Sequence, residues 1–405
     1  MKFSSAPCLN EAAPLTRRLI PWWSDLSEAA QAALQIPALA DGDIFSEKFD
    51  LIVVGAGIAG LSATLAAAKL GLSVLCLEAG STIGLGATGR NAGILCAGIN
   101  MPITEAPQGG ESGQLWLATA QALSETALAA KQLGSLIRLT QRGGLGLATS
   151  KTAVKRLQQE AKARTAAGLN AHMLGVSEVK KMSDGRLNLE AVQAAICYPD
   201  EGNIQPLTLL AQTAADARAL GAQIVGGASV VSCEENKNAA ATWRVKLSTG
   251  QTLHAPTLIK AVGPTAAPTA RIYALSFAVD LPESFPLFWD AAPYIYYDFR
   301  PGNGRLTTSG GRYARVGEDR ATDLRYHARM AAATTTWLPE LRGHTPEYTW
   351  AVDLEVASDL VPHLTPLGRE KRAYAIDGLG ALGVMPGVVL ARQAASKLAQ
   401  KLKTK

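Results

Sequence analysis

Three glycines in the spacing Gly55-x-Gly57-x-x-Gly60 form the first pattern in the sequence that has a chemical meaning. In such a pattern the first glycine permits a tight turn, the second lets the backbone approach a pyrophosphate, and the third lets a helix pack against a strand. The helix that follows offers unpaired N–H groups and a positive dipole end to the phosphates. We therefore predict a dinucleotide site, with an ordinary glycine turn as the alternative.

An acidic residue follows where such a site needs one. Glu78 ends the next apolar run, LSVLCLE, at the position where a carboxylate accepts hydrogen bonds from both hydroxyls of an adenosine ribose. A carboxylate there also disfavours the 2′-phosphate of NADP. The acidic residue strengthens the dinucleotide interpretation.

A second glycine-rich stretch, GLGATGRNAGIL from Gly84 to Leu95, begins only six residues after Glu78. That is too soon for the next turn of a simple NAD-binding sheet. The stretch offers backbone N–H groups, the Thr88 hydroxyl and the Arg90 cation to an anionic, carbonyl-rich partner such as an isoalloxazine with its pyrophosphate. It favours FAD over NAD, and a flexible surface loop is the alternative. From both stretches we expect cofactor contacts at Gly55, Gly57, Ile58, Ala59, Gly60, Glu78, Ala79, Thr88, Gly89, Arg90, Asn91, Ala92 and Gly93.

The surrounding sequence supplies the elements that would position these residues. FDLIVV is typical of a strand, LSATLAAAKLG of a helix and LSVLCLE of a second strand, which together open a dinucleotide-binding fold. Further helices are expected over 27–35, 115–139, 207–221, 324–337 and 388–402. Hairpins are expected in TWRVKLSTG–QTLHAPTLIKAVG and around PGNG. The fold class predicted is α/β, with a Rossmann-like FAD-binding domain interleaved with a β-rich substrate domain of mixed or antiparallel sheet.

The domain boundaries follow from this alternation of elements. Residues 1–47 are expected to be a lead-in without chemistry. The FAD-binding domain is expected over 48–145, 190–265 and 350–405, and the substrate domain over 146–189 and 266–349.

Composition excludes several classes of function. The 405 residues are 48% hydrophobic and 18% charged with a net charge of +5, which is typical of a globular protein and offers no nucleic-acid surface. Five widely spaced cysteines form no CxxC pair and five histidines show no metal spacing, so we expect neither disulfides nor a metal. The N-terminus lacks a signal-peptide pattern and the long apolar run 51–68 carries the glycine turn, so we expect a cytoplasmic protein without a transmembrane segment.

These motifs resemble a known family. FDLIVVGAGIAGLSATLAAAKLGLSVLCLEAG followed by GATGRNAGIL resembles the N-terminal signature of the FAD-dependent D-amino acid oxidase superfamily, which includes glycine and sarcosine oxidases and related dehydrogenases. DEGNIQPLTLLAQTAADARALGAQIV, TLIKAVGP, SDLVPHL and GLGALGVMPGVVLARQAASKLA keep the family's order, so the resemblance covers about residues 48–402. It implies support of the adenine side by Val230, a strand end at Gly263 behind the cofactor, and a turn at Gly383, Val384 and Met385 that reaches the pyrimidine edge of the flavin.

The chain also departs from the family pattern. Ala381 and Leu382 stand where amine-oxidising relatives usually have Gly-His, and Leu354 stands where relatives carry a carboxylate-binding arginine. Val352 is nearest to the position of the cysteine that tethers flavin in sarcosine oxidases, which implies non-covalent FAD. The segment between Gly263 and Phe288 is shorter than in the family.

The resemblance to the family implies that the substrate lies over the flavin, on the inner face of the β-rich domain. In PYIYYDFR the strand alternation places Tyr294 and Tyr296 on one face, where they would cage an amine, and core aromatics of a sheet are the alternative. Arg305, or Arg312, would replace the missing carboxylate clamp, and a surface position is the alternative for each. We expect Tyr294, Tyr296 and Arg305 to position the substrate.

The resemblance implies a FAD-dependent oxidoreductase that oxidises a C–N bond of an amine or amino acid by hydride transfer to flavin N5, giving an imine that hydrolyses. Its partners would be that substrate and oxygen or a quinone-type electron acceptor. Two alternatives stay open: a FAD-dependent 2-hydroxy acid dehydrogenase on the same fold, and a flavin-binding subunit with little turnover.

Overall fold

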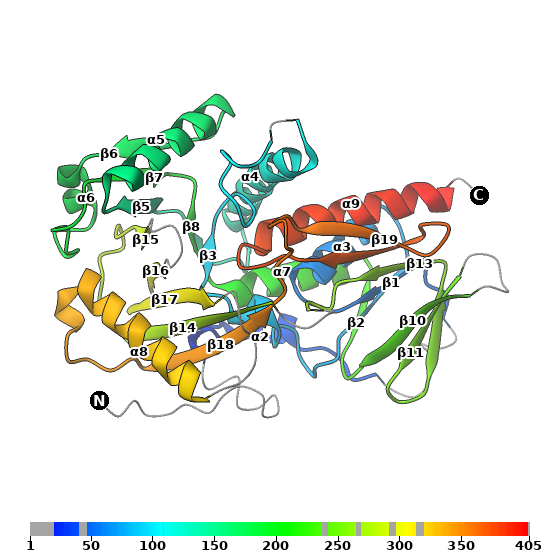
Figure 1. The fold of residues 1–405 in the computed structure, drawn as a ribbon. Coiled ribbons are helices and arrows are strands. Elements are labelled where there is room, and N and C mark those ends of the chain that lie inside the picture. The colour runs from blue at the N-terminus through cyan, green and yellow to red at the C-terminus, as the bar shows by residue number, and fades with distance from the viewer. Residues whose placement is uncertain are drawn as a thin grey trace.

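The computed structural model describes residues 20–39, 47–107, 109–236, 242–264, 269–290, 297–312 and 320–403. Its strands form four sheets, of which the two largest face each other across the molecule (Figure 1). The six-stranded sheet has the order β19 (His363–Leu367), β20 (Ala373–Asp377), β13 (Thr257–Lys260), β1 (Leu51–Val54), β2 (Val74–Leu77) and β9 (Gln223–Val225). All its neighbouring pairs are parallel except β19 and β20.

The strands of the six-stranded sheet are apolar on both faces because each face is covered. Leu51 and Val53 point into a core shared with helices, whereas Ile52 and Val54 point into a core shared with Trp243 of β11. The helices are α2 (Glu28–Leu34), α3 (Ile58–Lys69), α4 (Glu111–Ala130), α7 (Pro206–Ala219) and α9 (Val384–Lys403). The opposite cover is the antiparallel sheet of β10 (Val230–Asn236), β11 (Thr242–Leu247) and β12 (Thr252–Ala255).

The eight-stranded sheet forms the other half of the molecule. Its order is β18 (Tyr348–Leu354), β14 (Ala270–Ala278), β17 (Arg305–Arg312), β16 (Tyr297–Gly302), β15 (Leu287–Asp290), β5 (Gly144–Ala148), β7 (Ala194–Tyr198) and β6 (His172–Leu174). Every neighbouring pair is antiparallel except β15 and β5. Helices α5 (Lys151–Ala166), α6 (Val176–Met182) and α8 (Arg320–Trp337) pack beside it.

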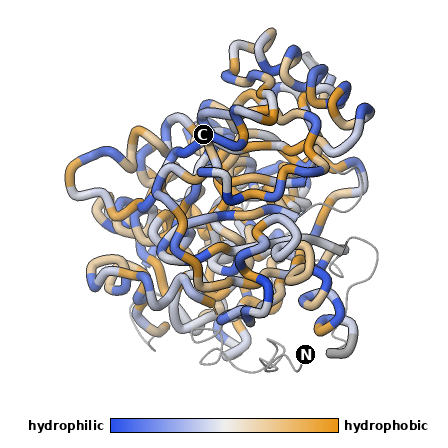
Figure 2. Tube along the Cα trace, turned by 90° about the vertical axis from the view of Figure 1, so that its left-hand side faces the viewer, coloured by the Kyte–Doolittle hydropathy of each residue, from blue (hydrophilic) through white to orange (hydrophobic). Residues whose placement is uncertain are grey.

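Short elements connect the two halves. They are β3 (Ile94–Leu95), β8 (Gly202–Ile204) and β4 (Leu139–Thr140), which form a small sheet, and the 3₁₀ turns η1 (Pro21–Trp23) and η3 (Ala87–Arg90). A further 3₁₀ turn, η4 (Pro339–Leu341), joins α8 to β18 within the second half. In Figure 2 hydrophobic stretches run through the middle of the molecule, while hydrophilic residues recur along its outer loops. The connectors therefore join two halves that each have a large apolar core.

The predicted fold class is confirmed, and several elements fall where the sequence placed them. The 27–35 helix is α2, whose first turn is capped by Ser27. The PGNG hairpin joins β16 to β17 through Asn303 and Gly304, both with positive φ, as a two-residue turn between twisted strands requires. The predicted 115–139 helix is shorter and ends at Ala130, before Gly134 with φ +79°.

Two strands pair differently from the proposed domain division. Strand β7 falls in the segment 190–265 that was expected in the FAD-binding domain, yet it pairs with β5 in the eight-stranded sheet. Strand β18 likewise runs past residue 350 while pairing with β14. Both strands are predominantly apolar, so the sequence did not distinguish which of two buried sheets each one joins.

Candidate functional site

A cavity of about 560 Å³ is lined by both large sheets. One side consists of the loops that follow β1, β2, β13 and β20, which are parallel strands whose carboxyl ends meet at one edge of the sheet. The other side comes from β14 to β18, together with α5 and the turn after β7. Ligands of open α/β sheets bind at that edge, and the volume suits a cofactor with part of a substrate.

The turn after β1 is built from glycines because backbone packs directly on backbone there. Gly55 has φ +98°, and a Cβ on it would lie 2.4 Å from the carbonyl oxygen of Ala261. A Cβ on Gly60 would lie 1.8 Å from the carbonyl oxygen of Gly55. Gly57 has only the Thr88 hydroxyl near its absent side chain, at 3.4 Å, and lines the cavity. The N-terminus of α3 therefore opens into the cavity without side chains in the way.

Glu78 is held rigidly at the end of β2. Its Oε2 accepts a hydrogen bond from the Ala56 N–H at 2.8 Å, and its Oε1 accepts one from the Gly80 N–H at 2.9 Å. Each carboxylate oxygen has a further lone pair, and the side chain lines the cavity. The carboxylate thus fixes the glycine turn and still offers acceptors to a ligand.

The stretch 84–95 folds as a compact loop around η3. The Thr88 hydroxyl accepts a hydrogen bond from the Ile58 N–H at 3.2 Å, and the Asn91 side chain bonds the Thr88 carbonyl and the Gly93 N–H at 2.7 and 2.8 Å. A Cβ on Gly89 would lie 1.9 Å from the Gly84 carbonyl oxygen. Several of these glycines are therefore bare because the loop packs on itself, which differs from the expectation that they lie against a flavin.

The structure places the expected cofactor residues in two groups. Lining the cavity are Gly55, Gly57, Ile58, Ala59, Glu78, Thr88, Asn91, Ala92, Gly263, Gly383, Val384 and Met385. The residues that do not line it are Gly60, Ala79, Gly89, Arg90, Gly93 and Val230. Arg90 belongs to the second group: its carbonyl accepts a 2.7 Å hydrogen bond from the Trp350 indole, and burial lowers the pKa of its guanidinium. Arg90 therefore connects the loop to β18 and does not line the cavity.

The turn before α9 completes the cofactor side. Gly378 and Gly380 have φ +65° and +66°, and the Asn100 side chain brackets the turn by accepting from the Leu382 N–H and donating to the Leu379 carbonyl. Gly383 then precedes the 20-residue helix α9. A helix N-terminus therefore faces the cavity here as well.

These residues fit the FAD that the sequence predicts. Two helix N-termini, a fixed carboxylate and glycine turns without side chains border one cavity. They offer the N–H donors and acceptors that a pyrophosphate, a ribose and a flavin edge require.

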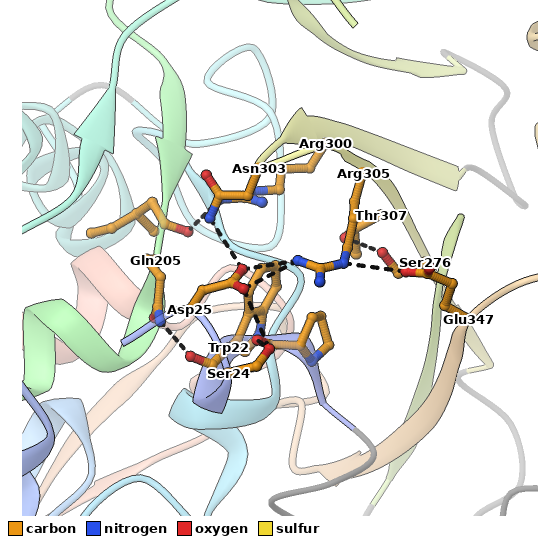
Figure 3. A network of polar contacts seen from close by, with 12 residues as sticks. Trp22, Ser24, Asp25, Gln205, Ser276, Arg300, Asn303, Arg305, Thr307 and Glu347 are labelled. Atoms are coloured by element: carbon orange, nitrogen blue, oxygen red, sulfur yellow. Dashed lines mark hydrogen bonds and ion pairs between the residues drawn. The ribbon is translucent and has the colours of Figure 1, made fainter. Parts of the chain in front are cut away.

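The expected substrate residues are not brought to the site as a group. Tyr294 and Tyr296 lie outside the described residues. Arg305 does not line the cavity, because its guanidinium forms ion pairs with Asp25 at 3.1 Å and Glu347 at 3.4 Å (Figure 3). The expectation that Arg305 positions substrate is corrected accordingly.

The lead-in segment provides the ion-pair partner that holds Arg305 away from the cavity. Figure 3 shows Asp25 between Arg305 and Asn303, beside Trp22 of η1. The Trp22 indole donates to the Asn91 carbonyl at 2.9 Å, and its own carbonyl accepts from Gln205 at 2.6 Å. The described part of the lead-in thus fastens the 84–95 loop to the PGNG hairpin.

Sequence reasoning missed a stack of aromatic and charged side chains on the substrate side. The Arg164 guanidinium lies 3.9 Å from the Tyr198 ring centroid and 4.8 Å from that of Trp116. Tyr198 stacks on Trp289 at 5.3 Å, and the Trp289 ring covers Gly144 and Gly146 of β5. Cavity-lining members are Trp116, Arg164, Tyr198 and Trp289.

Two carboxylates pair with this arginine, and a third lines the same cavity. Glu160 and Glu201 each accept a 3.0 Å ion-pair hydrogen bond from Arg164, and Asp298 also lines the cavity. Burial raises the pKa of Glu201 to about 7 although Arg164 lowers it, and burial together with the charge on Glu201 raises the pKa of Asp298 to about 7. The spacing of Glu160 and Arg164 on one helix face was the only sequence signal for this cluster.

Two further observations concern the described residues alone. None of their His, Cys, Asp and Glu side chains gather in a group of three or more that could hold a metal ion. Among the described helices, none has the length and apolar character to cross a membrane.

Comparisons with known proteins agree with this geometry. Residues 50–397 match the family model of FAD-dependent oxidoreductases. The fold is similar to glycine oxidase from Geobacillus kaustophilus, with a TM-score of 0.73, 19% identity and coverage of 87% of this chain and 95% of that one. It is also similar to L-proline dehydrogenase from P. horikoshii, with a TM-score of 0.72, 16% identity and coverage of 88% and 94%.

A third solved structure was determined with its cofactor. L-α-glycerophosphate oxidase from Mycoplasma pneumoniae, with FAD bound, has a TM-score of 0.71, 15% identity and coverage of 87% of this chain and 95% of that one. No curated protein matches the chain in sequence.

Proposed function

The chain belongs to the family of FAD-dependent oxidoreductases, and from this premise we propose that it oxidises a C–N bond of an amine or amino acid. The observation that carries the proposal is the sign of the charge on the substrate side of the cavity. Glu160 and Glu201 pair with the guanidinium of Arg164, and Asp298, Asp290 and Arg156 line the same cavity, so acidic groups outnumber basic ones there. An amine approaches as an ammonium ion and is attracted, whereas a 2-hydroxy acid approaches as an anion and is repelled.

Residues of the cofactor side would hold FAD through backbone groups and one carboxylate. We propose that the N-terminus of α3 binds the pyrophosphate and that Glu78 accepts hydrogen bonds from the ribose hydroxyls. The backbone N–H groups of Val384 and Met385, at the start of α9, would stabilise negative charge at the pyrimidine edge. Bound FAD supplies a two-electron acceptor for the hydride that leaves the carbon next to the neutral amine, after which the substrate imine is hydrolysed by water.

The eight-stranded sheet contributes shape and water exclusion. Ile272, Val352 and Leu354 present apolar side chains to the cavity, and Gly310 and Gly311 of β17 present bare backbone. Such a surface positions a C–H bond by contact and lowers the local dielectric. The charged groups at the other end of the cavity then determine which substrate enters.

The absorbance of the purified holoenzyme under anaerobic conditions tests the proposal. Amines, D- and L-amino acids and 2-hydroxy acids are added separately, and bleaching of the flavin bands is followed. We expect bleaching by amines or amino acids with release of ammonia or a smaller amine. Bleaching by 2-hydroxy acids alone would replace the proposal with C–O oxidation. No bleaching by any of these classes would favour a flavin-binding subunit.

A further inference from the structure

We propose that the substrate is a di- or polyamine without a free carboxylate, and that Glu201 and Asp298 hold its distal ammonium group. The inference rests on the proposed function and narrows its substrate class. It begins from three elements, α5, the turn between β7 and β8, and β16, which bring Arg164, Glu201 and Asp298 to one cavity.

Arg164 is the obvious candidate for binding a substrate carboxylate, but its guanidinium is already engaged. Glu160 and Glu201 each accept one of its hydrogen bonds at 3.0 Å, and its side chain is only 11% exposed. The guanidinium also lies against the rings of Trp116 and Tyr198, at 4.8 and 3.9 Å from their centroids. A substrate carboxylate would have to displace a buried carboxylate that is held on the protein.

Glu201 has one oxygen left without a donor. Its side chain is 3% exposed, and its Oε2 has no hydrogen-bond partner among the described residues. The nearby β5 backbone at Gly144 has no side chain, so a Cβ built there would lie 3.0 Å from this Oε2. A buried, unpaired carboxylate oxygen is costly, and an ammonium group brings three N–H donors to satisfy it.

Asp298 provides the second carboxylate. It lines the cavity from β16, as Glu201 does from the turn after β7, and burial together with the charge on Glu201 raises its pKa. Apart from Glu78, the acidic residues that line the cavity are Glu160, Glu201, Asp290, Asp298 and Glu355, and the basic ones are Arg156 and Arg164, so acidic groups are in excess even with Glu201 and Asp298 partly protonated near pH 7. A second ammonium balances this excess, whereas a substrate carboxylate increases it.

The walls beside the carboxylates suit an aliphatic chain. Tyr198 and Trp289 stack on one another and line the cavity together with Leu157. Aromatic faces pack against methylene groups and attract an ammonium ion. At the position where the family carries a carboxylate-binding arginine, Leu354 presents an apolar side chain to the cavity. The cavity therefore combines an apolar wall with an anionic end.

The test uses ligands that differ by one group. The holoenzyme is first reduced with dithionite under anaerobic conditions, so that no substrate is consumed, and is titrated calorimetrically. The ligands are α,ω-diaminoalkanes of three to six carbons, n-alkylamines of equal length, and ornithine and lysine in both configurations. We expect the best diamine to bind at least about tenfold more tightly than its alkylamine and its amino acid, the effect of one charge-assisted hydrogen bond.

Three variants test whether Glu201 and Asp298 cause the tighter binding of diamines. Glu201→Gln and Asp298→Asn should each weaken diamine binding by about tenfold and leave alkylamine binding within about twofold. Asp200→Asn is the matched control, because Asp200 precedes Glu201 but its carboxylate is bonded to the exposed Asn170. FAD content and thermal unfolding report whether each variant folds. If Glu201→Gln loses FAD, Asp298→Asn carries the test.

Proton release gives a second measurement that does not depend on turnover. An ammonium group that binds Glu201 and Asp298 as carboxylates should release the protons that they carry at pH 7, because burial raises the pKa of each carboxyl to about 7. Titrations in buffers of different ionisation enthalpy measure that release. The number of protons released on binding should fall by more than half in Asp298→Asn.

The outcomes separate the inference from the proposed function. Equal binding of diamine and alkylamine, or tighter binding of ornithine or lysine, would overturn the inference, and the second result would assign Arg164 to a substrate carboxylate. Flavin reduction by amino acids but not by diamines would overturn the inference alone. Flavin that stays oxidised with every amine and amino acid would overturn the proposed function.

Discussion

One side of the cavity is built mainly from backbone groups, and the other side is built from side chains. The cofactor side uses backbone N–H groups, glycines and one carboxylate, Glu78, all within the loops after parallel strands. The substrate side uses buried charged and aromatic side chains, with Arg164 between Trp116 and Tyr198. The first side is made by local chain geometry, and the second only by tertiary packing.

This difference determines which kind of substitution disrupts each side of the cavity. A backbone site fails when an added atom pushes two main-chain segments apart. A buried charge cluster fails when one partner is removed and the other is left unpaired in a low dielectric. We therefore expect changes on the cofactor side to affect the fold and FAD together, and changes on the substrate side to affect charge balance and pH dependence.

The largest effect is expected at the glycine turn. Gly60→Ala would place a Cβ 1.8 Å from the Gly55 carbonyl oxygen, in the interior of the β1–α3 unit. We expect loss of bound FAD and a fall of about 3 kcal/mol or more in the free energy of unfolding. The absorbance ratio of flavin to protein and urea unfolding measure the two effects.

Gly71→Ala is the matched control for that variant. Gly71 ends the same helix with φ +81°, but a Cβ there meets nothing within 4 Å. The expected cost is about 1 kcal/mol from backbone strain, with FAD retained. If Gly60→Ala binds FAD as well as Gly71→Ala does, the backbone account of the cofactor side is wrong.

The next effect is expected at the centre of the charge cluster. Arg164→Met keeps most of the side-chain volume but leaves Glu160 and Glu201 without their cation, and their side chains are 6% and 3% exposed. We expect a loss of about 3–5 kcal/mol in the free energy of unfolding at pH 8. Urea unfolding of the variant and the wild type measures the difference.

The loss should shrink as the pH falls. Burial already raises the pKa of Glu201 from 4.5 to about 7 beside Arg164, so the folded state holds a proton that the unfolded state has lost in this window. Stability from this group is therefore present at low pH and is lost as the pH rises through about 7. Without Arg164, the ionised form of Glu201 is still less favourable in the folded state, so the variant should gain more stability when Glu201 is protonated. A pH-independent loss between pH 5.5 and 8 would contradict the role of Glu201.

The same contrast explains what the sequence could and could not predict. The positions of Gly55, Gly57 and Glu78 follow from short-range rules, because strand, turn and helix are adjacent in the chain. Glu201 and Asp298 are 97 residues apart (298 − 201) and line one cavity only because β16 and β7, which precedes Glu201, belong to one sheet. No local spacing marks such a pair.

Arg305 shows how the missing tertiary information led to a wrong expectation. Its position after the PGNG turn made it the nearest cation to the predicted substrate face. The partner that removes it from that role, Asp25, lies 280 residues away in a segment to which the sequence assigned no chemistry. The identity of an arginine's partner depends on the packing of the whole chain.

A smaller effect than at Arg164 is expected at Glu78, which we propose binds the adenosine ribose. Glu78→Gln keeps the side-chain length and one carbonyl acceptor but loses the negative charge and one acceptor oxygen. We expect FAD to bind about 10–100-fold more weakly, the range for hydrogen bonds to a charged group. Titration of the apoprotein with FAD, followed by fluorescence quenching, measures the change. Unchanged affinity would mean that Glu78 only supports the turn through Ala56 and Gly80.

The smallest effect is expected at Arg305, whose ion pairs should contribute less to stability than those of Arg164. Arg305 and Asp25 are 19% and 16% exposed, so water screens their attraction more than it screens the Arg164 pairs. Arg305→Ala should lower the free energy of unfolding by about 1 kcal/mol or less and leave kcat/KM within about twofold. Steady-state kinetics with the preferred substrate and urea unfolding measure both. A loss of kcat/KM with unchanged stability would mean that Arg305 does contact the substrate. A small loss of stability with unchanged kcat/KM would mean that burial and a position in the cavity distinguish a functional arginine, such as Arg164, from a structural one.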